Sequence, residues 1–205
     1  SAQVYTVNAG TWSAQGSALT AGTDGVSGDR FGAAVDYSDD YAIIGAPGVS
    51  TNQGAAWPFE RSNAQVWSAQ PRLDLGTDAA ADDFFGSSVS ISGPRIVVGA
   101  YGRDRVVGGA TLEDAGEAFA YGLKRGDWVL ETPVDPLAGS DAFAGDQVGY
   151  SVAISGDLAL LGAPQLGGRP GPAIDTNGAG YAFVRNVSPP LTVTLPESQP
   201  TLIAG

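Results

Sequence analysis

The segment that decides the fold runs from Asp83-Phe84-Phe85-Gly86 through Ser87-Ser88-Val89-Ser90-Ile91 to Val97-Val98-Gly99-Ala100-Tyr101. Related segments lie on either side of it, at residues 29–47 and 146–164. Gly45 to Gly99 is 54 residues and Gly99 to Gly162 is 63. A segment that recurs in phase over this distance is typical of one supersecondary unit repeated along the chain.

Each unit predicts a four-stranded antiparallel sheet. In the first strand apolar residues alternate with small ones, which is the period of a β-strand, and we expect Val35, Val89 and Val152 to pack in equivalent environments. The second strand is apolar throughout, as expected where neighbouring sheets cover both faces. Tight turns such as Ser155-Gly156-Asp157 separate the two strands. Aromatic residues spaced two apart, such as Phe119 and Tyr121, indicate the third strand.

A tryptophan strand follows the aromatic strand. Trp67 and Trp128 recur at the same place in the first two units, and Trp12 takes that place near the N-terminus, after Val4-Tyr5-Thr6-Val7. Exposed tryptophans can form platforms for sugars, but recurrence at one outer-strand position favours packing between sheets. Residues 1–28 therefore predict the last two strands of an incomplete unit, followed by a linker.

This order of Phe-Gly, short strand, Gly-Ala-Pro and aromatic strand resembles the FG-GAP repeat, which forms the blades of integrin α-type β-propellers and occurs in secreted bacterial proteins. The resemblance covers roughly residues 1–185. Two positions depart from it, Tyr101 in place of Pro and Val148 in place of Phe. The resemblance implies an all-β fold of about three four-stranded blades and a leading half-blade. The blades are expected at residues 29–82, 83–145 and, as a partial blade, 146–186.

The number of blades bears on assembly. A closed propeller usually needs about 4–8 blades, so the fold is expected to be incomplete without a partner chain. Residues 187–205 contain the β pattern Leu191-Thr192-Val193-Thr194-Leu195. This tail could complete the third blade or be donated as a strand to another subunit.

Composition narrows the classes of function. The chain carries 10 Lys+Arg against 22 Asp+Glu, for a net charge of −12. This charge argues against nucleic-acid partners, and the short apolar runs argue against a membrane span. The chain has no His and no Cys, which removes the imidazole base and the thiol nucleophile. With no carboxylate distinguished from its equivalents in the other units, we expect no enzyme activity.

Carboxylates recur in pairs before each unit. These pairs, five residues apart, are Asp24 and Asp29, Asp78 and Asp83, and Asp141 and Asp146. They are candidate calcium ligands, together with Asp175 and Asn177, because calcium prefers oxygen ligands on flexible loops. Their recurrence in every unit favours instead a structural role, in which the carboxylate accepts backbone N–H groups. The calcium ligands that the resemblance would imply, in an Asp-rich loop between the first two strands, are missing because that loop is a tight turn. No cofactor is expected, with calcium as the one candidate.

The long loops between second and third strands are the best candidates for a binding surface. They hold the candidate ligand-binding residues Arg103, Asp104, Arg105 and Arg169. Three functions follow: an adhesion or ligand-binding module with a protein or glycan ligand, a self-assembling subunit of a filament, sheath or ring, and an accessory domain of a larger secreted enzyme. The N-terminal Ser1 and the absence of Met predict a processed or trimmed chain, and we expect an extracellular or cell-surface protein.

Overall fold

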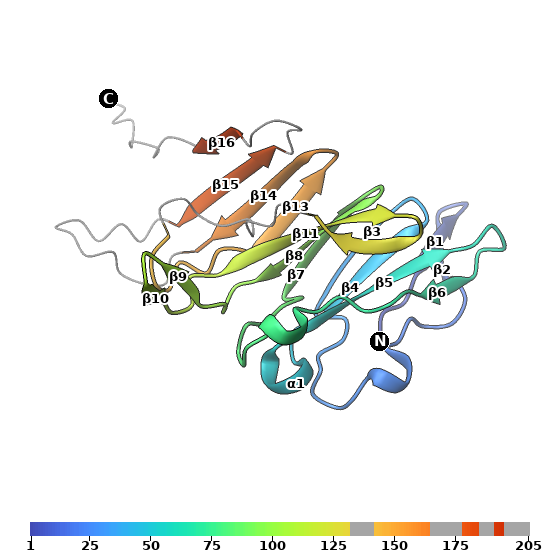
Figure 1. Ribbon diagram of the computed structural model, residues 1–205. Coiled ribbons are helices and arrows are strands. Elements are labelled where there is room, and N and C mark those ends of the chain that lie inside the picture. The colour runs from blue at the N-terminus through green and yellow to red at the C-terminus, as the bar shows by residue number, and fades with distance from the viewer. Residues whose placement is uncertain (132–141, 165–177, 185–190, 195–205) are drawn as a thin grey trace, which may run out of the picture.

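The computed structural model describes residues 1–131, 142–164 and 178–184, and the backbone of residues 191–194. Three four-stranded antiparallel sheets lie side by side along the chain, each in sequential strand order (Figure 1). Blade 1 contains β3 (Ala34–Ser38), β4 (Tyr41–Ala46), β5 (Ala55–Arg61) and β6 (Trp67–Ala69). Blade 2 contains β7 (Ser88–Ser92), β8 (Arg95–Ala100), β11 (Glu117–Lys124) and β12 (Asp127–Leu130). Blade 3 contains β13 (Ser151–Ser155), β14 (Leu158–Ala163), β15 (Ala179–Val184) and β16 (Leu191–Thr194).

The remaining elements are short. Two antiparallel hairpins lie outside the blades, formed by β1 (Tyr5–Asn8) with β2 (Thr11–Ala14) and by β9 (Arg105–Val107) with β10 (Ala110–Leu112). The helical turns are η1 (Gly22–Asp24), α1 (Val49–Asn52) and η2 (Gly76–Asp78). No helix in the described part of the chain has the length and hydropathy needed to cross a membrane.

The first two strands of each blade are joined by the two-residue turn predicted from the sequence. The first turn residue has a positive φ in all three blades, 55° at Asp39, 51° at Gly93 and 57° at Gly156. Asp and Gly tolerate this left-handed backbone better than most residues, which explains their presence here. The turns set the register, so Val35 lies opposite Ile44 and Val89 opposite Val98.

The blades pack face to face. We call the face of a sheet that carries Val35, Val89 or Val152 its leading face, and the opposite face, which carries Ile43, Val97 or Leu160, its trailing face. The trailing face of blade 1 packs on the leading face of blade 2 in a cluster that contains Ile43, Ala56, Val89, Ile91, Ile96, Val98, Phe119 and Tyr121. The trailing face of blade 2 packs on blade 3 in a cluster that contains Val97, Ala118, Val148, Ala159, Leu161 and Tyr181.

The same polar contact joins consecutive blades. The Ser38 hydroxyl of blade 1 accepts a hydrogen bond from the Gly93 N–H of blade 2 at 3.0 Å. The Ser92 hydroxyl of blade 2 accepts one from the Gly156 N–H of blade 3, also at 3.0 Å. One interface is therefore built twice within the chain.

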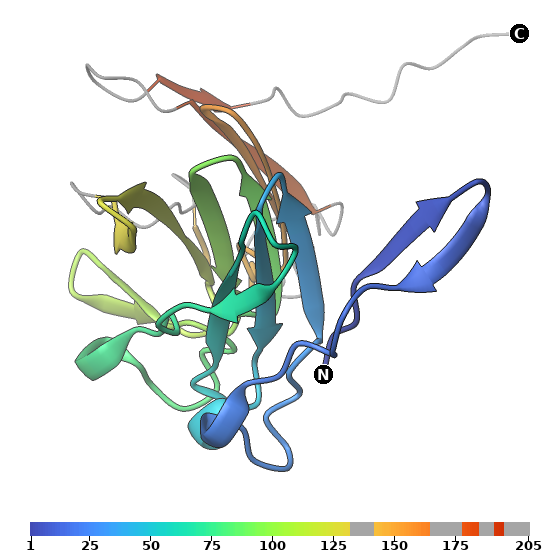
Figure 2. The same ribbon diagram turned by 90° about the vertical axis from the view of Figure 1, so that its right-hand side faces the viewer.

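The N-terminal residues form the outer half of a further blade, which we call the half-blade. Its Gln15 N–H donates to Val4 O at 2.8 Å, in the way that Gln70 N–H donates to Pro58 O at 2.9 Å in blade 1. The bridge between Ala2 and Leu19 likewise repeats the bridge between Ala56 and Leu73. The base of the half-blade packs on the leading face of blade 1, but its hairpin β1–β2 projects away from the three sheets (Figure 2).

Two expectations about packing are wrong at the ends of the blade series. Val89 is buried and Val152 partly buried, but Val35 is exposed, because no described strand lies before β3 as β3 lies before β7. The second strand is covered on both faces in blades 1 and 2, whereas in blade 3 Leu158 and Leu160 are exposed. The described sheets thus form an open series with uncovered faces at both ends.

The segment expected as a β tail contributes β16, which pairs antiparallel with β15, with Val184 opposite Leu191. In the single chain, residues 191–194 thus take the fourth position of blade 3. This is the first of the two alternatives for the tail, and donation of the same strand to another subunit would require it to leave β15.

Candidate functional site

The second carboxylate of each predicted pair holds a loop together. Asp29, Asp83 and Asp146 are buried, with 4%, 2% and 0% of their surface exposed. In each case Oδ2 accepts a hydrogen bond from the N–H three residues earlier, at 2.8 Å from Val26, 2.8 Å from Ala80 and 2.7 Å from Phe143. This geometry matches the structural role favoured from the sequence, because each carboxylate satisfies its own loop.

The pairs do not converge on one point. Asp24 and Asp78 are exposed, at the ends of η1 and η2, while Asp29 and Asp83 are buried. Asp141, Asp175 and Asn177 lie outside the described residues. Within the part of the chain that the structure describes, no three Asp or Glu residues come together in a group that could hold a metal ion.

The predicted rim residues Arg103 and Arg105 belong to an ion-pair cluster at the loop end of blade 2. The Arg103 guanidinium contacts the Asp83 carboxylate at 3.0 Å and the Glu117 carboxylate at 2.9 Å. Arg105 contacts the other oxygen of Glu117 at 3.1 Å. Arg103 also donates to the carbonyl oxygen of Asp78 at 2.9 Å, so it joins three segments of the chain.

Burial raises the pKa of the two carboxyl groups in this cluster. Desolvation raises the pKa of Asp83, and the hydrogen bond from Ala80 and the charge of Arg103 offset this only in part. Desolvation raises the pKa of Glu117 in the same way, against the opposing charges of Arg103 and Arg105. The cluster is therefore a buried, internally compensated network, which accounts for why two arginines stand so close together here.

The cluster supports a hairpin that the sequence analysis missed. Strands β9 and β10 form it around Gly108-Gly109, a two-residue turn that the sequence could have indicated. Arg105 fixes the start of β9, and the Asp104 carboxylate accepts a hydrogen bond from Asp114 N–H at 2.9 Å where the chain returns. Val106 and Val107 are exposed on this hairpin. Arg169, the fourth rim candidate, lies outside the described residues.

Aromatic side chains lie beside the same loops. Tyr101, which stands where the other two units have proline, is stacked on Phe84 with 4.9 Å between ring centroids and 6° between planes. Its other neighbour is Tyr150 of blade 3, at 5.3 Å. The departure from Gly-Ala-Pro in blade 2 therefore serves an aromatic contact between the loops of blades 2 and 3.

The tryptophans fall into two groups. Trp57 is buried, and Trp67 and Trp128 are partly buried between sheets, with Trp128 edge-on to Tyr41 of the preceding blade at 5.6 Å. The packing role predicted for the recurring tryptophans fits Trp67 and Trp128. Trp12 differs, because 68% of its surface is exposed.

Sequential four-stranded sheets that pack face to face, each built on the same repeat, define a β-propeller-type repeat protein. The model of the FG-GAP repeat matches the sequence three times, at residues 12–59, 67–121 and 133–184. The chain belongs to the FG-GAP repeat family. Comparison with curated proteins gives no significant match. FG-GAP repeats are typical of extracellular and cell-surface proteins.

Proposed function

We propose that this chain is a non-catalytic, extracellular adhesion or ligand-binding protein, and that it binds a protein partner through the loop end of blade 2. Membership of the FG-GAP family supports an extracellular binding role. Loops on a rigid β scaffold are where binding residues are commonly found.

The observation that carries this proposal is the β9–β10 hairpin. Its apolar residues Val106 and Val107 face solvent, while Arg103, Arg105 and Glu117 tie its base to blade 2. A preorganised hairpin loses little conformational entropy when a partner covers it. Val106 and Val107 are successive strand residues on opposite faces of the hairpin, so a partner that covers both must enclose the hairpin. Such apolar contact suits a protein rather than a glycan, whose recognition depends on polar and aromatic groups.

The absence of catalysis is part of the same proposal. General acid–base chemistry needs a titratable group that can reach a substrate. Asp83 and Glu117 have raised pKa values, but both are buried and already contact arginines. The arrangement favours a structural use for this cluster.

The test is binding of the immobilised chain to fibronectin, fibrinogen, collagen and laminin, followed by interferometry. We expect at least one of them to bind, and the double substitution V106S/V107S to weaken that binding at least tenfold. V129S is the matched control, because Val129 is also an exposed valine but lies on β12, away from the hairpin. Absence of binding to all four, or an equal loss in V129S, would contradict the proposal.

A second candidate function is self-assembly, which the uncovered faces at both ends of the blade series favour. The first route considered for it, donation of residues 191–194, competes with the pairing of β16 and β15 in the same chain. Packing of the open faces needs no strand to leave its sheet.

A further inference from the structure

The half-blade presents an apolar face that nothing in the described residues covers. In the β1–β2 hairpin Tyr5 pairs with Ala14 and Val7 pairs with Trp12, so Tyr5, Val7 and Trp12 share one face. These three side chains are 57%, 54% and 68% exposed. The opposite face carries Thr6, Asn8, Thr11 and Ser13, so the hairpin is amphipathic although both of its faces are in solvent.

The equivalent face in blade 2 shows what this surface is built to contact. By register, Tyr5 corresponds to Tyr121 and Trp12 to Trp128, since Tyr121 pairs with Leu130 and Leu123 with Trp128. Tyr121 is buried in the cluster that includes Ile43, and Trp128 packs edge-on against Tyr41. Outer-strand residues of a leading face thus pack on the second strand of the preceding blade.

The only described second strand with a free trailing face is β14. Its residues Leu158 and Leu160 correspond to Tyr41 and Ile43 of blade 1. Ile43 is fully buried, whereas 47% of the surface of Leu160 is exposed. Leu158 and, on the adjacent strand, Val184 are also exposed. The trailing face of blade 3 is therefore the kind of surface on which the half-blade face would pack.

One chain does not bring these two surfaces together, because the half-blade and blade 3 lie at opposite ends of the series with blades 1 and 2 between them (Figure 1). We propose that a second copy of this chain docks its half-blade face, formed by Tyr5, Val7 and Trp12, on the trailing face of blade 3, formed by Leu158, Leu160 and Val184. The contact continues the interface that already joins blades 1 and 2. Because the two surfaces differ, the association is head to tail and extends until it closes into a ring or grows as a fibre.

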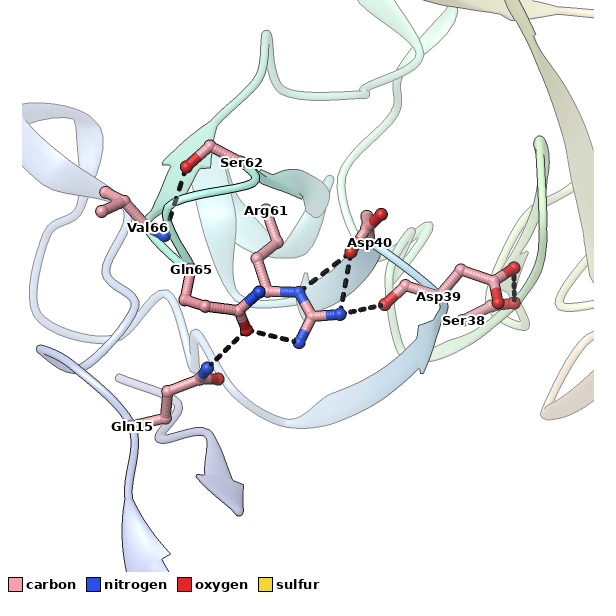
Figure 3. A network of polar contacts seen from close by, with 8 residues as sticks. All are labelled: Gln15, Ser38, Asp39, Asp40, Arg61, Ser62, Gln65 and Val66. Carbon is pink, nitrogen blue, oxygen red and sulfur yellow. Dashed lines mark hydrogen bonds and ion pairs between the residues drawn. The ribbon is translucent and has the colours of Figure 1, made fainter.

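The half-blade is held in place for this contact by a polar network (Figure 3). The Gln15 side-chain amide donates a hydrogen bond to the side-chain oxygen Oε1 of Gln65 at 3.0 Å, and the Arg61 guanidinium donates to the same oxygen at 3.2 Å. Arg61 also contacts the Asp40 carboxylate at 2.8 Å. These contacts tie the return of the hairpin to the outer turn of blade 1.

The test is sedimentation velocity of the full chain over a range of concentrations, at about 0.15 M salt so that repulsion between copies with a charge of −12 is screened. We expect masses above the 20.7 kDa of one chain that increase with concentration. W12E, which removes one surface, and L160E, which removes the other, should each remain monomeric. Both residues are exposed, so the melting temperature of each variant should stay close to that of the unmodified chain.

Mixing the two variants gives the sharpest outcome. The L160E chain keeps its half-blade face and the W12E chain keeps its blade 3 face, so a mixture should form a one-to-one dimer and nothing larger. The control V26E alters an exposed valine in the loop before β3, outside both surfaces, and should assemble like the unmodified chain. A monomeric unmodified chain at every concentration, a mixture that does not dimerise, or loss of assembly in V26E would each overturn the inference. None of these results decides the adhesion proposal, which is read from V106S/V107S.

Discussion

Asp83 and Arg103 form an ion pair at 3.0 Å in which the carboxylate is almost entirely buried and the guanidinium one fifth exposed. Arg103 bridges from it to Glu117, so a single side chain compensates two buried acids. The link connects the loop before β7 with the loop after β8 and with the start of β11. The stability of the loop end of blade 2 depends on this bridge.

Replacement of Arg103 by alanine should cost about 3–5 kcal/mol in the free energy of unfolding, because Asp83 stays buried without its guanidinium partner while Glu117 keeps only Arg105. Urea denaturation measures this loss. R103K should be intermediate, since one ammonium group cannot reproduce the geometry of the planar guanidinium. The matched control is R72A, which breaks the exposed pair with Asp74 and should cost about 0–1 kcal/mol. Equal losses in R103A and R72A would contradict the bridging role.

Within an aspartate pair, loss of the buried carboxylate should destabilise the fold more than loss of the exposed one. D29A removes the buried acceptor of Val26 N–H and should cost about 1–3 kcal/mol, whereas D24A, at an exposed position, should stay within about 0.5 kcal/mol. Chemical denaturation measures both costs, and thermal denaturation with and without a chelator tests for a bound ion. With a structural role for Asp29, the chelator should not change the melting temperature. A large cost of D24A together with a chelator-sensitive melting temperature would instead indicate a calcium site.

The glycine of the Gly-Ala motif should be required for stability only where the backbone of the following blade lies in contact with it. A methyl group on Gly99 would overlap the carbonyl oxygen of Gly149, a backbone atom of blade 3. On Gly162, the only described atoms it would overlap belong to the side chain of Ser151, which can rotate. G99A should therefore destabilise the chain by about 1–3 kcal/mol more than G162A. Calorimetry of the two variants decides this, and equal melting temperatures would contradict the blade packing.

The pH dependence of stability should reflect the raised pKa of Glu117. The unfolded chain releases this proton near the ordinary value of 4.5, whereas the folded chain retains it to higher pH. Between the two pKa values the folded state binds more protons, so the free energy of unfolding falls as the pH rises through that window. E117Q should remove this contribution, so its melting temperature should fall less as the pH rises from 4.5. An unchanged slope in E117Q would contradict the raised pKa.

Much of the blade architecture follows from local sequence. The alternation at Val89 and Ile91, the turn at Gly93 and the paired aromatics Phe119 and Tyr121 each specify a strand or turn through short-range preferences. Three in-phase copies then specify face-to-face packing, because a single sheet cannot bury both of its faces. The hydrogen bond between Gln15 and Val4 shows that even the half-blade keeps the register of a full unit.

The remaining features depend on contacts between distant residues. Arg103 meets Asp83 and Glu117 only because blade topology brings residues 20 and 14 positions away to one place. Trp12 occupies the same sequence position as Trp128 and differs from it only in having no described blade in front of it. Sequence equivalence predicts which surface a residue belongs to, but the neighbours present in space decide whether that surface is covered.

The repetition of one interface has a consequence for how such proteins change length. Ser38 and Ser92 make the same contact with the blade that follows. A duplicated unit inserted between blades 1 and 2 could therefore make this contact with both of its neighbours. Blade number can then vary in single steps through duplication or loss of one repeat, without any new surface having to evolve.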